Sequence, residues 1–351
     1  MKTSIKLVVK FFMQNQQPKF IVVIGTSSGG FFALAELISQ LNDKMDASFF
    51  VVMHLSHHSI GGYLVSQMQK FTTLLCQEAD NNTVIKKGTI YFAQPNKHLI
   101  IKNEKVILGF GPEENRWRPS IDVLFRSAAA AYDGHTIGIV LTGMLDDGTA
   151  GMATIKTCGG TAIVQDPNEA EYPDMPLSVL KEIEVDYCIP LSKMGAAISE
   201  IIAAKHVENK PIPADIIKEV EIAEKGGTID ELQQLGQNSL FSCPDCGGVL
   251  FELKDDSITR YKCHTGHTYS VNDLLLKQNK ALESSLWVAV RSLEERKKLL
   301  SQLAEKNIQR GFHRSASDFK EKIAELKKHI DNLKVVLFAT EGEKGNIEYP
   351  L

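Results

Sequence analysis

Residues 21–30 read IVVIGTSSGG, an apolar run that ends in a short turn rich in serine and glycine. The β-branched run predicts a buried strand, and the glycines after it permit a sharp turn into a helix. Such a turn either binds a phosphate through backbone N–H groups or holds a reactive side chain at the strand end. The spacing matches neither G-x-G-x-x-G nor G-x-x-x-x-G-K-[ST], so nucleotide binding is the weaker interpretation.

Short β-branched runs alternate with amphipathic stretches on both sides of this turn, between residues 20 and 205. The runs are FIVVIG, SFFVVMH, TIYFA, HLIIK, TIGIVLTG, TAIVQD and DYCIPL. Buried strands separated by helices, such as those expected over 32–41 and 121–132, predict an α/β fold with a doubly wound, mostly parallel sheet. In such sheets, functional residues lie at the carboxyl ends of the strands.

The overall composition is that of an ordinary soluble protein with two or three folded units, since 351 residues are more than one core usually supports. A net charge of -4 gives no basic surface, so nucleic acid is not an expected partner. No segment reaches the roughly 20 apolar residues that a membrane helix needs, so no membrane insertion is expected. Three of the six cysteines cluster with histidine, which favours a reducing, cytoplasmic setting.

The rest of the chain divides into five predicted segments. Residues 1–19 form a leader before the domain at 20–205. Residues 206–240 mix Pro, Gly and charges and predict a linker with one short helix at most, and 241–270 form a small Cys/His module. Apolar residues spaced three or four apart, including Leu275, Leu282 and Leu303, predict a helical hairpin or coiled coil over 271–341, followed by a tail at 342–351. This stripe packs within one chain or in a dimer.

Three residues at predicted strand ends suit nucleophilic catalysis. Ser27 is the serine of a G-x-S-x-G pattern, which holds a hydroxyl at the end of a strand. A serine needs a base, and the base needs a carboxylate to orient it. His54 ends SFFVVMH and Asp147 follows TIGIVLTGM, with Asp146 as the rival carboxylate. The chain order Ser, His, Asp differs from that of ordinary α/β-hydrolases.

Six motifs in this region resemble the chemotaxis protein-glutamate methylesterases of the CheB type, over about residues 20 to 200. They are IGTSSGG, VVMHLS, GTIYFAQPNKHL, RPSIDVLFRSAA, IGIVLTGMLDDGTAGM and TAIVQDPNEAEYPDMP. The resemblance implies that Ser27 is the nucleophile, His54 the base and Asp147 its carboxylate partner. It also implies that the backbone N–H groups of Ser28 and Met144 stabilise the oxyanion.

The same resemblance implies a reaction that needs no catalytic cofactor. Family members hydrolyse the γ-methyl ester of glutamate on the cytoplasmic helices of chemoreceptors and release methanol, and some also deamidate glutamine. Only about 20 residues precede the first strand, so we expect a member without the receiver domain of the best-known relatives. Arg118 and Asp122 brace the site or form a structural salt bridge. The alternative function is a signalling scaffold that binds receptor or another partner through the Cys/His module and the C-terminal helices.

The Cys/His module has the ligand spacing of a structural zinc site. Cys243 and Cys246 form a C-P-x-C-G-G knuckle, and Cys263 with His267 or His264 completes a Cys₃His set. His267 is the preferred fourth ligand, because His264 directly follows Cys263 and is awkwardly placed to share one metal. Four protein ligands leave no open position for catalysis.

The remaining cysteines and two further histidines are interpreted as structural residues without a catalytic role. Cys76, Cys158 and Cys188 lie in apolar contexts that predict buried packing residues. His98 and His135 are most simply loop or surface histidines, although His98 belongs to a family-like motif and could line the cleft.

Overall fold

The computed structural model describes residues 17–54, 61–204, 207, 210–255 and 258–342. Most of the predicted leader and of the predicted tail, residues 1–16 and 343–351, lie outside the described residues. The chain divides after Asp273 into two compact units, each of which is described by itself. Among the described helices, none combines the length and the apolar character needed to cross a membrane.

A seven-stranded sheet of order β10-β9-β8-β1-β2-β5-β3 forms the centre of the first unit. All of its neighbouring strands pair in parallel, so the predicted doubly wound α/β fold is confirmed. The strands are β1 (Phe20–Thr26), β2 (Ala47–Met53), β3 (Leu75–Glu78), β5 (Thr89–Phe92), β8 (Thr136–Val140), β9 (Thr161–Gln165) and β10 (Tyr187–Ile189).

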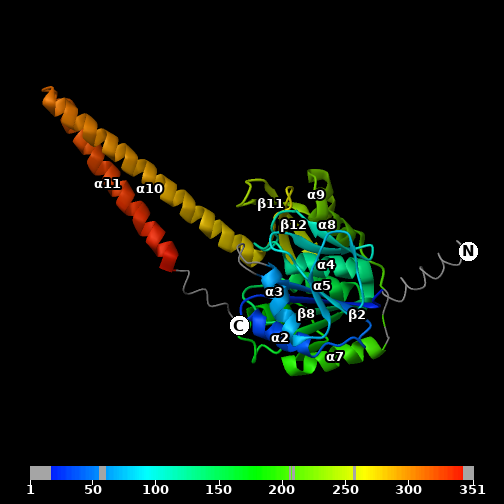
Figure 1. Cartoon of the computed structure of the whole chain (residues 1–351). Helices are drawn as coiled ribbons and strands as arrows, with labels where there is room; N and C mark the ends of the chain where they lie inside the picture. The colour runs from blue at the N-terminus through cyan, green and yellow to red at the C-terminus, as the bar shows by residue number, and fades with distance from the viewer. Residues whose placement is uncertain (1–16, 55–60, 205–206, 208–209, 256–257, 343–351) are drawn as a thin grey trace, which may run out of the picture. The chain divides into compact units, whose positions relative to one another are not determined.

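Helices cover both faces of this sheet, which explains why its central strands are apolar throughout. In β1, Val22 and Ile24 pack against one helical layer, and Ile21 and Val23 pack against the other. Figure 1 shows α2 and α7 on one side of the strands and α4 and α5 on the opposite side. The first layer holds α2 (Gly30–Ser39), α3 (Gly61–Met68) and α7 (Leu191–Ala204), and the second holds α4 (Ile121–Tyr132), α5 (Thr149–Thr157) and α6 (Asp174–Glu182).

The strand order reverses between β1 and β8, and this point is where ligands bind in doubly wound sheets. The strand ends are level there, because Gly25 pairs with Val140 and Thr26 pairs with Met53. Residues that directly follow β1, β2 and β8 therefore leave the sheet at the same edge.

One predicted strand of the main sheet lies elsewhere. HLIIK forms β6 (His98–Lys102), which pairs antiparallel with β7 (Lys105–Gly109) in a separate three-stranded sheet completed by β4 (Thr83–Val84). Asn103 and Glu104 join β6 to β7 and have φ values of 49° and 58°. Two successive positive φ values make the tight hairpin turn that returns the chain antiparallel.

The segment at 206–240, for which the sequence predicts a linker, is instead largely folded. It contains α8 (Ala214–Lys225), α9 (Ile229–Leu235) and the start of β11 (Gln237–Ser242). On α8, Val220 and Ala223 pack against the α/β domain, and Ile222 packs against Phe251 of the following β-sheet. The linker prediction is wrong because one face of α8 is apolar and buried between two structures.

The Cys/His module is a four-stranded antiparallel sheet, here called the ribbon. Its strands are β11, β12 (Val249–Asp255), β13 (Ile258–Cys263) and β14 (Thr268–Ser270). The ribbon belongs to the same compact unit as the α/β domain. It is therefore not an independent module.

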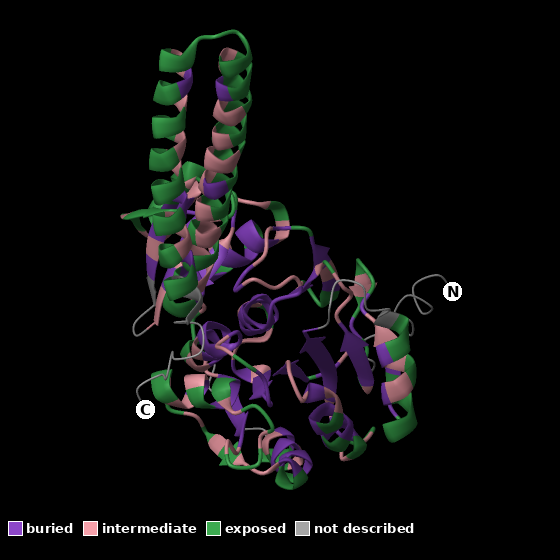
Figure 2. Cartoon of the chain, turned by 90° about the vertical axis from the view of Figure 1, so that its left-hand side faces the viewer, coloured by how far each residue is buried: buried purple, intermediate pink, exposed green. Residues whose placement is uncertain are grey.

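The second unit is the predicted helical hairpin, built from α10 (Val271–Gln309) and α11 (His313–Gly342). Val290, Ile330 and Leu337 form its buried core, and Figure 2 shows most of its other surface as exposed or intermediate. Leu275 and Leu282 of the predicted stripe are exposed. Since α11 has 30 residues and α10 has 39, α11 is too short to cover the beginning of α10. Binding of a partner through this hairpin stays a prediction.

Candidate active site

The glycine-rich turn after β1 fixes Ser27 at the edge of the sheet. The Ser27 N–H donates to Thr142 O at 3.1 Å, and Gly30 N–H donates to Ser27 O at 2.9 Å. Gly29 has φ of 73°, a conformation that favours glycine. A Cβ atom at Gly143 would lie 2.9 Å from Ser27 Cβ. The small residues that the sequence shows around this turn are therefore sterically required.

The structure brings Ser27, His54 and Asp147, here called the triad, into one hydrogen-bonded chain. His54 Nδ1 lies 3.3 Å from Ser27 Oγ, and His54 Nε2 lies 2.9 Å from Asp147 Oδ2. Ser27 and His54 directly follow β1 and β2, and Asp147 lies in the loop after β8. The backbone N–H of His54 donates to Thr26 O at 3.1 Å. His54 is 9% exposed and Asp147 is 4% exposed, whereas Ser27 is half-buried and reachable from solvent.

Asp147 lies in a ring of neutral donors at the start of α4. Besides His54, it accepts hydrogen bonds from the amides of Ile121 (2.8 Å) and Asp122 (3.2 Å), the Ser120 hydroxyl (3.0 Å) and the Asn115 side-chain amide (3.0 Å). Burial acts to raise the pKa of Asp147, but the hydrogen bond and the charge of His54, together with the hydrogen bonds from Ile121 and Asn115, outweigh it and lower the pKa. The carboxylate is thus kept ionised and oriented toward the imidazole.

Asp146, the rival carboxylate, is directed elsewhere. Burial raises the pKa of Asp146, while the nearby side chains of Ser270 and Asn272 and the charge of Arg116 act to lower it. The carboxylate that contacts His54 is Asp147, as the motif resemblance implies.

Asp122 and Arg118 have separate roles, and the predicted pairing between them is not formed. Asp122 Oδ1 accepts from the amides of Gly148 (3.0 Å) and Gly151 (2.6 Å), which fixes the turn that follows Asp147. Burial and the charge of Asp147 raise the pKa of Asp122 to about 7. Arg118 instead donates to Asn96 Oδ1 and to Gly111 O, so it braces a loop.

Two residues that touch the triad escape the sequence reasoning. Asn115 Nδ2 donates to Asp147 Oδ1 at 3.0 Å and to Asp122 Oδ2 at 2.7 Å. The Trp117 ring stacks on the His54 imidazole, with centroids 4.1 Å apart and planes inclined by 8°. Both lie in an irregular loop, where no periodicity marks them, and the only signal is their nearness to the RPSID motif.

The predicted oxyanion donors are the backbone N–H groups of Ser28 and Met144. Within the part of the chain that the structure describes, the N–H groups of Ser28 and Met144 donate to no other group. Met144 follows Gly143, whose Cα approaches the Ser27 side chain closely. Oxyanions are stabilised by N–H donors that have no other partner. This role of Ser28 and Met144 stays a prediction.

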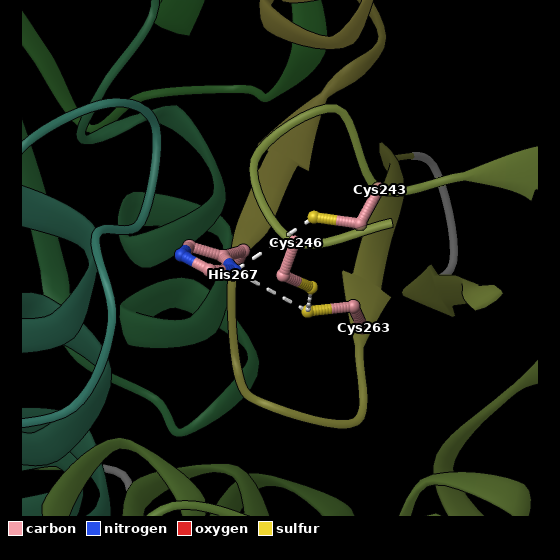
Figure 3. A group of neighbouring side chains, drawn as sticks. All are labelled: Cys243, Cys246, Cys263 and His267. Atoms are coloured by element: carbon pink, nitrogen blue, oxygen red, sulfur yellow. Dashed lines mark hydrogen bonds between the residues drawn. The ribbon is translucent and has the colours of Figure 1, made fainter. Parts of the chain in front are cut away.

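The predicted metal ligands form a second cluster in the ribbon. The ligand atoms of Cys243, Cys246, Cys263 and His267, here called the Cys/His cluster, all lie within 4.8 Å of one another. Figure 3 shows the three thiols and the imidazole directed toward one another. His264 is not part of this group; its ring lies against Gly248, where an added Cβ would be 2.7 Å from His264 Cε1.

The distances in the Cys/His cluster fit a tetrahedral ion. Zinc bonds of about 2.3 Å to sulfur and about 2.0 Å to nitrogen place tetrahedral ligand atoms about 3.5 to 3.8 Å apart. Cys246 Sγ lies 3.7 Å from Cys263 Sγ, and His267 Nδ1 lies 3.7 Å from Cys243 Sγ and 3.5 Å from Cys263 Sγ. The residues present therefore fit a zinc ion.

The predictions for Cys188 and His98 need correction. Cys76 and Cys158 are buried as expected, and burial raises the pKa of each thiol to about 11. Cys188 is exposed, because β10 is an edge strand of the sheet. His98 is fully buried and lies 2.8 Å from Pro112 O through Nε2, so it is a core residue and does not line the surface. His135 is half-buried and contacts Asp133.

A buried chain of five charges joins the ribbon to the α/β domain. Glu114 lies 2.6 Å from Arg126 and 2.7 Å from Lys262, and Glu219 lies 3.4 Å from Arg126 and 2.7 Å from Arg260. All five side chains are at most 5% exposed. Burial acts to raise the pKa values of Glu114 and Glu219, but the surrounding cations lower both, that of Glu219 to about 2.

The parallel sheet and the hydrogen-bonded triad at its switch point define an α/β enzyme of the hydrolase class. Residues 22–198 match the sequence model of the family described as CheB methylesterase. The chain belongs to this family, so the resemblance drawn from the six motifs is confirmed.

Several relatives support this assignment. Protein-glutamate methylesterase/protein-glutamine glutaminase 2 of Xanthomonas campestris is 34% identical over 187 residues, which cover 52% of this chain and 53% of the relative. A Leptospira interrogans protein provisionally given the same two activities is 37% identical over 175 residues, or 50% of this chain and 90% of that protein. The crystal structure of the Thermotoga maritima CheB methylesterase catalytic domain aligns with a TM-score of 0.50 and 33% identity, covering 52% of this chain and 98% of that domain.

Proposed function

We propose that this protein hydrolyses glutamate γ-methyl esters on the cytoplasmic helices of chemoreceptors, with Ser27 as the nucleophile. The observation that carries the proposal is the hydrogen-bonded chain from Ser27 Oγ through His54 to Asp147. The names of the relatives, which are methylesterases and glutaminases, support the substrate class.

The geometry suggests how His54 serves as the base. Asp147 accepts a hydrogen bond from His54 Nε2, which keeps the proton on Nε2 and leaves the Nδ1 lone pair facing Ser27. The 3.3 Å contact between Nδ1 and Ser27 Oγ is long for a hydrogen bond, and such contacts shorten when substrate binds. Stacked on one face by Trp117, the imidazole keeps this orientation.

The reaction then follows acyl transfer. Ser27 Oγ attacks the ester carbonyl carbon while its proton passes to His54 Nδ1, and the C–O bond to methanol breaks as His54 returns that proton to the leaving oxygen. Water attacks the acyl-enzyme and gives one proton through His54 to Ser27 Oγ as the bond between Oγ and the acyl carbon breaks. The glutamic acid that forms releases the second proton to solvent and leaves as a carboxylate. The Ser28 and Met144 N–H groups would stabilise the negative oxygen of both intermediates. With glutamine, the same steps would release ammonia.

We further propose that the Cys/His cluster holds a structural zinc ion. The tetrahedral spacing supports this assignment, as do the amides of Gly247 and Gly266, which donate to Cys243 O and Cys263 O in two tight turns around the cluster. Tyr269 Oη lies 3.1 Å from Cys243 Sγ and orients it. The four ligands would leave no coordination site for substrate, so zinc would supply structure and no step of the reaction.

The test compares two adjacent serines. Ser27→Ala removes the nucleophile, and we expect methanol release from a methylated receptor fragment to fall at least about 10⁴-fold. Ser28→Ala keeps its backbone N–H and should retain activity within about tenfold. A larger loss in Ser28→Ala than in Ser27→Ala would show that Ser28, and not Ser27, is the nucleophile.

A further inference from the structure

Residues 113–118, here called the bridging loop, contact both the ribbon and the triad. On the ribbon side, Asn115 N–H donates to Thr268 O at 2.9 Å, and Thr268 N–H donates to Glu113 O at 3.4 Å. Glu114 Oε1 accepts from Lys262 Nζ at 2.7 Å. Thr268 directly follows the cluster residue His267, and Lys262 directly precedes the cluster residue Cys263. The chain neighbours of two cluster residues therefore contact three consecutive residues of the bridging loop, Glu113, Glu114 and Asn115.

The opposite side of the bridging loop touches the triad. Asn115 Nδ2 donates to Asp147 and Asp122, and Trp117 stacks on His54. The backbone N–H of Trp117 donates to Glu114 O at 3.0 Å, and that of Glu114 donates to Trp117 O at 3.2 Å. A displacement of Glu114 would therefore move Trp117 as well.

The bridging loop also has a conformation that needs outside support. Asn115 and Arg116 have φ values of 50° and 67°, which are costly for residues other than glycine. Arg116 Nε lies 2.8 Å from the buried Asp273 carboxylate, and Glu114 lies between Arg126 and Lys262 in the buried charge chain. Lys262 belongs to the ribbon and Asp273 to the start of α10, whereas Arg126 belongs to the α/β domain. The bridging loop is thus held from both sides, and the ribbon supplies part of its support.

We propose that metal binding at the Cys/His cluster holds the bridging loop and thereby positions Asn115 and Trp117 against the triad. Asn115 and Trp117 are positioning residues, since they act through Asp147 and His54. The metal sets the turnover rate without contacting substrate. The inference rests on the proposed function only for its kinetic readout, because the position of Trp117 can be followed without any turnover.

The main experiment removes the metal from the full chain. Purified protein should contain about one zinc per chain, and chelation should lower kcat at least about tenfold with little change in KM, restored by added Zn²⁺. Trp287→Phe leaves Trp117 as the single tryptophan, and its emission should change on chelation as the stacking on His54 loosens. Cys246→Ser should reproduce both effects, whereas Cys188→Ser, the same change at an exposed cysteine outside the cluster, should produce neither.

A second variant breaks the bridge while the metal site stays intact. Asn115→Leu removes both donated hydrogen bonds, so the Asp122–Asp147 pair should bind a proton more readily and the acid limb of the pH–rate profile should move to higher pH. The other charged groups that face this pair are His54, Asp146, Arg126 and Arg260. Asn81→Leu, which removes only a hydrogen bond to the Leu108 amide, should lower stability without shifting that limb.

The outcomes separate this inference from the proposed function. Zinc-free folded protein with unchanged kcat and unchanged Trp117 emission would overturn the inference and leave the esterase intact. If chelation unfolds the chain, the zinc-loaded Asn115→Leu variant decides. An acid limb of its pH–rate profile that is not shifted from wild type would then overturn the inference. A zinc-loaded wild type that releases no methanol contradicts the proposed function, while a metal-dependent Trp117 signal in that protein still supports the bridge.

Discussion

Asp147 and Glu114 are both buried carboxylates of the first unit, yet they are surrounded by different kinds of partner. Asp147 accepts from amides, a hydroxyl and an imidazole, and among the described residues no lysine or arginine forms an ion pair with it. Glu114 is paired with Arg126 and Lys262. In the same chain of charges, Glu219 is paired with Arg126 and Arg260.

The difference reflects what each carboxylate has to do. A carboxylate that stabilises a histidine as it gains a proton must keep its negative charge available, and a fixed cation beside it would cancel that effect. Neutral donors keep Asp147 ionised without cancelling its charge. A carboxylate that joins two parts of a fold is best saturated by cations, because an unpaired buried charge is costly. We therefore expect changes at Asp147 to affect the rate, and a change at Glu219, which is paired with Arg126 and Arg260 and not with the bridging loop, to affect stability.

The largest expected effect is on the rate, in Asp147→Asn. The amide cannot hold the His54 tautomer with its proton on Nε2, so methanol release should fall about 10⁴-fold. Asp146→Asn is the matched control, since the carboxylate that contacts His54 is that of Asp147, and this variant should remain within about tenfold of wild type. If Asp146→Asn lost the activity and Asp147→Asn kept it, Asp146 would be the carboxylate that orients His54.

Glu219→Gln tests the stability half of the comparison. Removing one partner of a buried ion pair should lower the free energy of unfolding by about 3–5 kcal/mol at pH 7, because Arg260 and Arg126 stay buried. Denaturant unfolding measures this loss, with kcat of the remaining folded enzyme near wild type. Glu224→Gln, on the same helix, breaks only the partly exposed pair with Lys102 and should cost no more than about 1 kcal/mol.

The pH dependence of stability gives the same variant a second signature. The pKa of Glu219 is lowered from 4.5 to about 2, so its stabilisation is present above pH 4.5 and is lost as the pH falls toward 2. The free energy of unfolding should therefore decline less steeply over this interval in Glu219→Gln than in wild type. An equally steep decline would mean that other carboxylates cause the acid sensitivity.

The smallest effect is expected from Ser120→Ala, which removes one neutral donor from Asp147. One hydrogen bond contributes about 1 kcal/mol, so kcat/KM should fall roughly fivefold. Ser120 precedes α4, but its side chain makes no capping hydrogen bond, so the helix should not weaken. Ser127→Ala, on the same helix but bonded to Leu124 O, should leave kcat/KM unchanged; a matching loss there would point to a general effect on α4.

Several features could be predicted from local sequence patterns. The β-branched runs predict six of the seven strands of the main sheet, all but β3, and the helix expected at 121–132 is α4 with the same bounds. The composition of HLIIK does not reveal that this strand belongs to the separate three-stranded sheet. Its pairing with β7 depends on the turn at Asn103 and Glu104, which lacks the Asn-Gly sequence typical of such turns. On α8, Ile216, Val220 and Ala223 follow helical spacing, a signal that the surrounding charges obscure.

The amino-acid sequence by itself determined six strands of the main sheet, the serine turn and the spacing of the Cys/His ligands, because each depends on neighbouring residues. Only the tertiary structure decided that Asn115 and Trp117 contact the triad. It also decided that five charged residues form a buried chain of ion pairs between the ribbon and the α/β domain. Charged residues and irregular loops usually lie at the surface, so their burial depends on partners up to 148 positions away, as for Lys262 and Glu114. No local pattern encodes such partners.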